Sequence, residues 1–134
     1  MHKTILLIDD ELDVLESHRL LLEAHGFAVL TAQNGEMGIQ LAKNYDLDLI
    51  VVDLLMPGMN GFQVIENLRF SIPNNCPIFL LTGNNKEAHQ DYARILGANE
   101  CLQKPLNFDE FFAVAKNYCP MFDLPLANYP IKSA

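Results

Sequence analysis

The chain has 134 residues, half of them hydrophobic and 19% charged, which suits one globular domain and leaves no room for a second. Seventeen acidic residues against nine basic ones give a formal net charge of -8, which repels nucleic-acid phosphates and anionic membrane surfaces. We therefore expect no direct nucleic-acid binding and no membrane association. The first apolar run, at residues 5–8, is too short for a signal peptide or a membrane span, so we expect a cytoplasmic protein.

The three cysteines, Cys76, Cys101 and Cys119, are widely separated, with no Cys-x-x-Cys pair and no histidine at zinc-finger spacing. We expect them to be reduced thiols. A catalytic pairing of a cysteine with a histidine is a remote alternative, because only proximity in the fold would create it.

The first strand and helix are marked clearly. Residues 5–8 form an apolar run of strand length that ends in Asp9 and Asp10. A helical pattern follows and stops at Gly26. Its side chains at three- and four-residue spacing are Val14, His18, Leu21 and Leu22.

The third strand is the most informative stretch. After a strand at residues 27–32 and a helix with Asn34 as its N-cap, residues 49–52 are apolar on consecutive positions. Such a run is typical of a strand buried on both faces of a parallel sheet. A carboxylate is costly inside such a sheet, so we expect Asp53 at its carboxyl edge, below a turn-rich loop at residues 57–61.

The second half of the chain repeats the alternation. A third helical pattern precedes a strand at residues 77–81, which ends in Thr82. A fourth helix stops at Gly97, and a brief strand at residues 100–103 ends before Lys104. A hydroxyl and an ammonium group thus follow these strands, where carboxylates follow the first and third.

The last helix has the clearest start, because Asn107 and Glu110 have capping-box spacing. Its phenylalanine-rich face is typical of core packing. Beyond it the periodic pattern is lost. We therefore expect one domain over residues 1–119 and a short C-terminal tail at 120–134, on the surface or disordered.

Five alternations of strand and helix predict an α/β fold, a doubly wound five-stranded parallel sheet with five helices and right-handed crossovers. Sites on such sheets lie where the strand order reverses. In the flavodoxin-like order 2-1-3-4-5 the first and third strands are neighbours, so Asp9, Asp10 and Asp53 converge. Thr82 and Lys104 then reach in from the fourth and fifth strands.

Three converging carboxylates repel one another by about 1 kcal/mol per pair in water and about 4 kcal/mol at an effective dielectric constant of about 20. Lys104 and a divalent cation are the candidates for compensating this charge, and an all-oxygen ligand set favours Mg²⁺ over zinc. An aspartate can also accept a phosphoryl group as a nucleophile, while hydroxyl and ammonium groups neutralise the phosphoryl oxygens.

These five polar positions, with the run Asp-Leu-Leu-Met-Pro-Gly-Met-Asn-Gly at 53–61 and the pair Lys104-Pro105, resemble the receiver domain of two-component response regulators, in its stand-alone, chemotaxis-regulator-like form. The resemblance extends from Lys3 to about Tyr118. Each motif alone is weak, and their joint occurrence in this order is specific.

The resemblance implies that Asp53 is the phosphoacceptor of a phosphorelay, with a sensor histidine kinase or a His phosphotransfer protein as donor and a downstream protein as target. Thr82 and Lys104 would contact the phosphoryl group, and a cis peptide would precede Pro105. The implied ligands of Mg²⁺ are Asp9, Asp10, Asp53 and the backbone carbonyl of Leu55. Such a domain is a signalling switch and no enzyme beyond its own phosphorylation and dephosphorylation.

The chain departs from the family pattern at one switch position. Cys101 stands where an aromatic residue commonly rotates inward together with the residue matching Thr82. We therefore expect a different readout of phosphorylation around the fourth helix, fifth strand and fifth helix. Leu55 and Asn84 occupy the positions that tune phosphoryl loss, and Leu55 cannot hydrogen-bond an attacking water, which predicts a longer-lived phosphoryl group.

Three other classes stay open. A pseudo-receiver would bind partners without phosphorylation, and the intact set of site residues argues against it. An Mg²⁺-dependent phosphatase or mutase would need an aspartate at position 55, and a flavodoxin would need a phosphate loop where Asp9 and Asp10 stand. The sequence leaves open the kinase, the target, a homodimer, and whether the domain stands alone or belongs to a larger protein.

Overall fold

The computed structural model describes residues 3–73, 75–83 and 87–119. Strands and helices alternate along them as β1 (Thr4–Ile8), α1 (Leu12–Ala24), β2 (Ala28–Ala32), α2 (Gly35–Asn44), β3 (Leu49–Asp53), α3 (Gly61–Ser71), β4 (Ile78–Thr82), α4 (Glu87–Leu96), β5 (Glu100–Gln103) and α5 (Phe108–Ala115). The predictions for Asn84 and for the tail at 120–134 lie outside the described residues.

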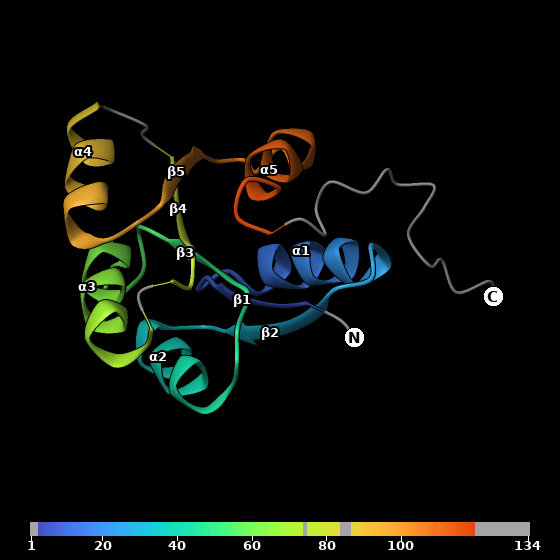
Figure 1. Cartoon of the computed structure of the whole chain (residues 1–134), viewed down its shortest axis with the longest axis horizontal. Coiled ribbons are helices and arrows are strands. Elements are labelled where there is room, and N and C mark those ends of the chain that lie inside the picture. The colour runs from blue at the N-terminus through green and yellow to red at the C-terminus, as the bar shows by residue number, and fades with distance from the viewer. Residues whose placement is uncertain (1–2, 74, 84–86, 120–134) are drawn as a thin grey trace.

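The strands form one parallel sheet in the order β2-β1-β3-β4-β5, as the flavodoxin-like prediction requires. β1 pairs with β3 from Ile5 opposite Leu49 to Ile8 opposite Val52. Helices α1 and α5 cover one face of the sheet, and α2, α3 and α4 cover the other (Figure 1). The strand order therefore reverses between β1 and β3, which is where a site is expected.

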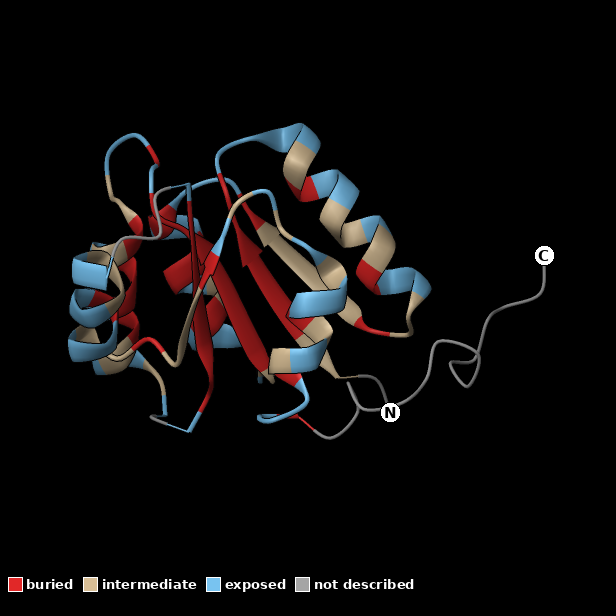
Figure 2. Ribbon diagram, turned by 90° about the horizontal axis from the view of Figure 1, so that it is seen from above, coloured by how far each residue is buried: buried red, intermediate tan, exposed pale blue. Residues whose placement is uncertain are grey.

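The core lies on both faces of the central strands, which are buried between the two helical layers (Figure 2). Ile50 and Val52 of β3 join the cluster that includes side chains of α2, α3 and α4. Leu49 and Val51 join the cluster that includes side chains of α1 and α5. All five residues of β3, including Asp53, are buried, which confirms the predicted two-sided burial of this strand.

Asparagines begin three of the helices. The Asn34 side chain caps α2 as predicted, accepting a hydrogen bond of 2.8 Å from a first-turn backbone N–H. Asn107 accepts one of 3.0 Å from the Glu110 backbone at the start of α5. A reciprocal capping box joins Asn60 and Gln63 at the start of α3, a signal that the sequence analysis interpreted only as a turn.

Helices α1 and α4 stop near glycines, as predicted, because Gly26 and Gly97 have φ of 92° and 117°, a region that L side chains rarely adopt. The buried side chains of α1 are Leu15 and Leu22. Leu15 was absent from the predicted apolar set. Among the described helices none is long and apolar enough to cross a membrane.

Candidate functional site

The carboxyl edge of the sheet carries the site. Asp9 directly follows β1, Asp53 and Thr82 are the last residues of β3 and β4, and Lys104 directly follows β5. Asp9, Asp53 and Thr82 are all buried. The Thr82 carbonyl accepts a hydrogen bond of 2.8 Å from the Lys104 backbone N–H, which joins the ends of β4 and β5. Parallel strands thus bring together the residues that the sequence analysis singled out.

The three acids form a tight cluster, because carboxylate oxygens of Asp9, Asp10 and Asp53 lie within 4.8 Å of one another. Asp9 Oδ1 accepts a hydrogen bond of 3.0 Å from the Glu11 backbone, which fixes the carboxylate. Asp9 Oδ2 is buried and has no hydrogen-bond donor among the described residues; Lys104 Nζ lies 3.6 Å away. A buried acceptor without a donor, beside two further carboxylates, fits a hard divalent cation.

Lys104 is paired with the phosphoacceptor candidate: its Nζ donates a hydrogen bond of 3.0 Å to Asp53 Oδ1. Burial raises the pKa of Asp53; the hydrogen bond from Lys104 opposes this rise, and the charges of Asp9 and Asp10 add to it. Burial acts to lower the pKa of Lys104, but the hydrogen bond and charge of Asp53 outweigh burial, so this pKa is raised. One ammonium group therefore does not compensate the three carboxylates.

The loop after β3 is fixed to the start of α3. Leu54 is buried, and its carbonyl accepts a hydrogen bond of 2.8 Å from the Gly61 backbone N–H. A Cβ at Gly61 would lie 2.6 Å from the Asp53 carbonyl oxygen, so only glycine fits this approach. The Leu55 side chain is exposed, and the metal-binding role of its carbonyl stays a prediction. From sequence, Asn60-Gly61 indicated only a turn, and this close approach of Gly61 to the Asp53 backbone was not predicted.

The structure also settles two smaller expectations. The Lys104–Pro105 peptide bond is cis, which confirms the implied geometry. All three cysteines are free, as predicted. Cys101 lies opposite Leu80 in the β4–β5 pair and packs, partly buried, against the cluster on the α2–α3–α4 side; burial raises the pKa of its thiol.

A doubly wound parallel sheet with clustered carboxylates and a paired lysine at its switch point defines a class of α/β proteins with an acidic site that could hold a cation. A family model described as the response regulator receiver domain matches residues 5–116. The chain belongs to this family, whose members are signalling domains of two-component systems.

Relatives agree with this assignment. The cell cycle response regulator CtrA of Brucella ovis is 39% identical over 111 residues, which are 81% of this chain and 47% of that protein. The chain spans about half the length of the curated relatives it matches.

Solved structures of response regulators share the fold. One from Clostridium difficile has a TM-score of 0.83 at 26% identity, covering 89% of this chain and 97% of that one. Another, from Burkholderia pseudomallei, has a TM-score of 0.77 at 32% identity over 83% of this chain and 65% of that one, and contains a phosphorylated aspartic acid, a calcium ion and citrate.

Proposed function

We propose that this chain is a phosphoacceptor receiver, in which Asp53 takes a phosphoryl group from a histidine kinase or His phosphotransfer protein in an Mg²⁺-dependent phosphorelay in the cytoplasm. Residues 1–119 form this receiver and 120–134 its tail. The main support is the convergence of carboxylate oxygens of Asp9, Asp10 and Asp53 within 4.8 Å; among the described residues Lys104 is the one cation paired with Asp9 and Asp53. The Burkholderia relative, which holds a phosphorylated aspartic acid and a calcium ion, adds support.

The donor set fits Mg²⁺. Asp9 Oδ2 has no donor in the described part of the chain, Asp10 is exposed to solvent, and Asp53 is paired with Lys104. Mg²⁺ prefers octahedral oxygen ligands and keeps several waters, so two or three carboxylates and the Leu55 carbonyl would suffice. When bound, it neutralises oxygens of the incoming phosphoryl group.

The chemical step is an in-line displacement. An Asp53 carboxylate oxygen forms a bond to phosphorus while the P–N bond to the donor imidazole breaks, and the imidazole leaves with that electron pair. Lys104, at 3.0 Å from Asp53 Oδ1, orients the nucleophile and then pairs with a phosphoryl oxygen. The Thr82 hydroxyl donates to another phosphoryl oxygen. Because Asp53 reacts as the carboxylate and its pKa is raised, the rate falls as the pH drops through that pKa.

The output is a change in a protein-binding surface that a downstream protein target recognises. The net charge of -8 supports a protein target rather than direct contact with nucleic acid.

Intact-mass analysis after incubation with acetyl phosphate, with and without Mg²⁺, tests the proposal. The chain is expected to gain one phosphoryl group only with Mg²⁺, and Asp53→Asn to gain none. Asp48→Asn, at the opposite edge of the sheet, is the matched control and retains the gain. If neither acetyl phosphate nor a panel of phosphorylated histidine kinases modifies Asp53, the chain is a pseudo-receiver.

The lifetime of the phosphoryl group tests the role of Leu55. Its exposed apolar side chain cannot orient an attacking water, so Leu55→Asn is expected to lose the phosphoryl group faster than the wild type. Leu20→Asn, the same exchange at an exposed leucine of α1, should leave the rate of phosphoryl loss unchanged. Equal decay in the Leu55→Asn variant and the wild type would contradict the prediction.

A further inference from the structure

Helix α4 is held to the domain by few buried side chains. Ala93 is its one fully buried residue among those described, while Tyr92 and Ile95 are exposed. The helix lies at the outer end of its layer, beside α3 (Figure 1). Because alanine buries little area and Leu96 is only partly buried against the core, contacts at the sides of α4 contribute to its position.

Contacts of two kinds join α3 to α4 among the described residues: hydrogen bonds from Arg69 to the Gly97 carbonyl just beyond the end of α4, and ring contacts of Phe62 along the helix. The Phe62 ring of α3 lies 4.8 Å from the Tyr92 ring of α4, at an interplanar angle of 80°. It also lies 6.1 Å from the His89 ring, at 73°. Edge-to-face arrangements of this kind are favourable beyond the apolar area that they bury.

Phe62 is also tied to the phosphoacceptor backbone. The preceding residue, Gly61, donates its N–H to the Leu54 carbonyl at 2.8 Å and packs directly on the Asp53 backbone. The Leu54 N–H in turn donates to the Leu81 carbonyl at 2.9 Å, beside the end of β4. The first turn of α3 therefore cannot shift without the backbone that carries Asp53.

The other side of α4 offers a weaker contact. On β5, Cys101 packs partly buried into the same cluster as Ala93, so the strand presents a thiol to this layer. A thiol has neither the area nor the ring geometry of the Phe62 contact.

We propose that Phe62 is the positioning residue that transmits the state of the Asp53 loop to α4, through its ring contacts with Tyr92 and His89. The inference rests on the proposed function, because it explains how phosphorylation of Asp53 would change the position of α4. Coupling between two sites requires an element whose position both of them influence. In this proposal that element is α4, which contacts Phe62 on one side and the downstream partner on the other.

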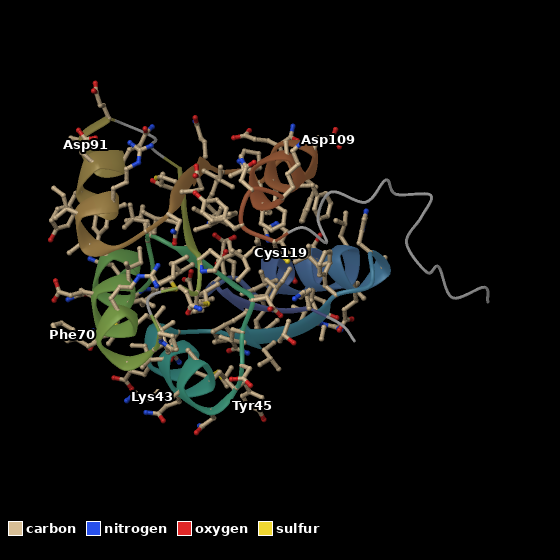
Figure 3. All side chains as sticks on the ribbon, in the orientation of Figure 1. Lys43, Tyr45, Phe70, Asp91, Asp109 and Cys119 are labelled. Carbon is tan, nitrogen blue, oxygen red and sulfur yellow. The ribbon has the colours of Figure 1, made fainter. Side chains whose placement is uncertain are left out.

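Hydrogen exchange of residues 87–96, with and without phosphorylation, tests the proposal, and intact mass records phosphorylation in each sample. The variants are Phe62→Leu and Tyr92→Leu, which remove the ring from either side of the contact. Phe70→Leu is the matched control, because Phe70 is on the same helix, is 90% exposed and points away from the molecule (Figure 3). Thermal unfolding establishes that each variant is folded.

In the wild type, phosphorylation is expected to change the exchange rate of α4. Phe62→Leu and Tyr92→Leu should be phosphorylated like the wild type, exchange roughly two- to tenfold faster in α4, and lose the phosphorylation-dependent change. Phe70→Leu should retain it. If exchange rises by the same factor in both states, Phe62 is merely structural and the inference fails. If the wild type takes no phosphoryl group, the proposed function fails first and the inference with it.

Discussion

The two edges of the sheet use charged residues in opposite ways. At the amino edge, Asp48 Oδ2 accepts a hydrogen bond of 2.8 Å from the Thr4 backbone and Oδ1 lies 3.8 Å from Lys3 Nζ, with both side chains partly exposed. At the carboxyl edge, Asp9 and Asp53 are buried together with one lysine between them. Charge is therefore matched at one edge and in excess at the other.

Arg69 shows a second way in which a charge is accommodated at the amino edge, by hydrogen bonds to neutral oxygens. From the last turn of α3 its guanidinium donates two hydrogen bonds to the Gly97 carbonyl at 2.7 and 2.9 Å, one to the Cys76 carbonyl at 2.8 Å and one to Asn99 Oδ1 at 2.9 Å. It thereby joins the entrances of β4 and β5. A guanidinium with several hydrogen-bond acceptors stabilises the fold, whereas the excess of carboxylates at the carboxyl edge costs stability and fits the phosphoryl chemistry that we propose.

Replacing Arg69 should give the largest effect on stability. Arg69→Met removes these hydrogen bonds and leaves carbonyls without a donor, so we expect a loss of about 2–4 kcal/mol in unfolding free energy. Urea denaturation measures it, and phosphorylation of Asp53 should be unchanged. Arg69→Lys keeps the charge but not the planar guanidinium with its several donors, and it should lose less stability than Arg69→Met. An equal loss in the two variants would show that the charge itself contributes nothing.

Removing Lys104 tests whether the carboxyl edge carries an excess of negative charge. Lys104→Met leaves Asp9 and Asp53 buried without a counter-charge, and we expect a loss of about 1–3 kcal/mol without Mg²⁺. The same denaturation experiment in saturating Mg²⁺ should recover part of this loss. A variant as stable as the wild type without Mg²⁺ would mean that Lys104 does not offset the carboxylates.

Asp53→Asn, in contrast, should increase the free energy of unfolding. Because the pKa of Asp53 is raised, its stabilising contribution is complete below the pKa of the unfolded chain and is lost as the pH rises through the folded-state pKa. Ionised Asp53 is therefore unfavourable at neutral pH, and Asn should add about 1–2 kcal/mol there. The gain should shrink as the pH is lowered into the acid range. A gain independent of pH would contradict this cause.

Lys3→Met should have the smallest effect. Its 3.8 Å pair with Asp48 is partly exposed, so we expect a change of at most about 0.5 kcal/mol, which 1 M salt removes. Salt titration of the urea midpoint measures it. A loss as large as that of Lys104→Met would erase the distinction between the two edges.

The features that could be predicted from sequence are those that depend on neighbouring residues. The apolar run before Asp53, the acids after β1 and the asparagine caps are visible in neighbouring residues, and the order of strands followed from their alternation. The sequence could not show Arg69, whose partners Gly97 and Asn99 are 28 and 30 residues away and have no local signature. For the same reason it did not identify the contact of Phe62 with α4, which arises only when α3 and α4 pack side by side.

The most direct test of excess charge at the carboxyl edge is thermal unfolding of the wild type and Asp53→Asn at neutral pH, with and without Mg²⁺. Mg²⁺ at a hundredfold excess over its Kd should add about 2.7 kcal/mol to the wild type. Asp53→Asn should start more stable and gain less, so that the two variants converge or cross in Mg²⁺. If Mg²⁺ leaves the wild type unchanged, or if Asp53→Asn is the less stable chain without it, the carboxylates at this edge do not hold uncompensated charge.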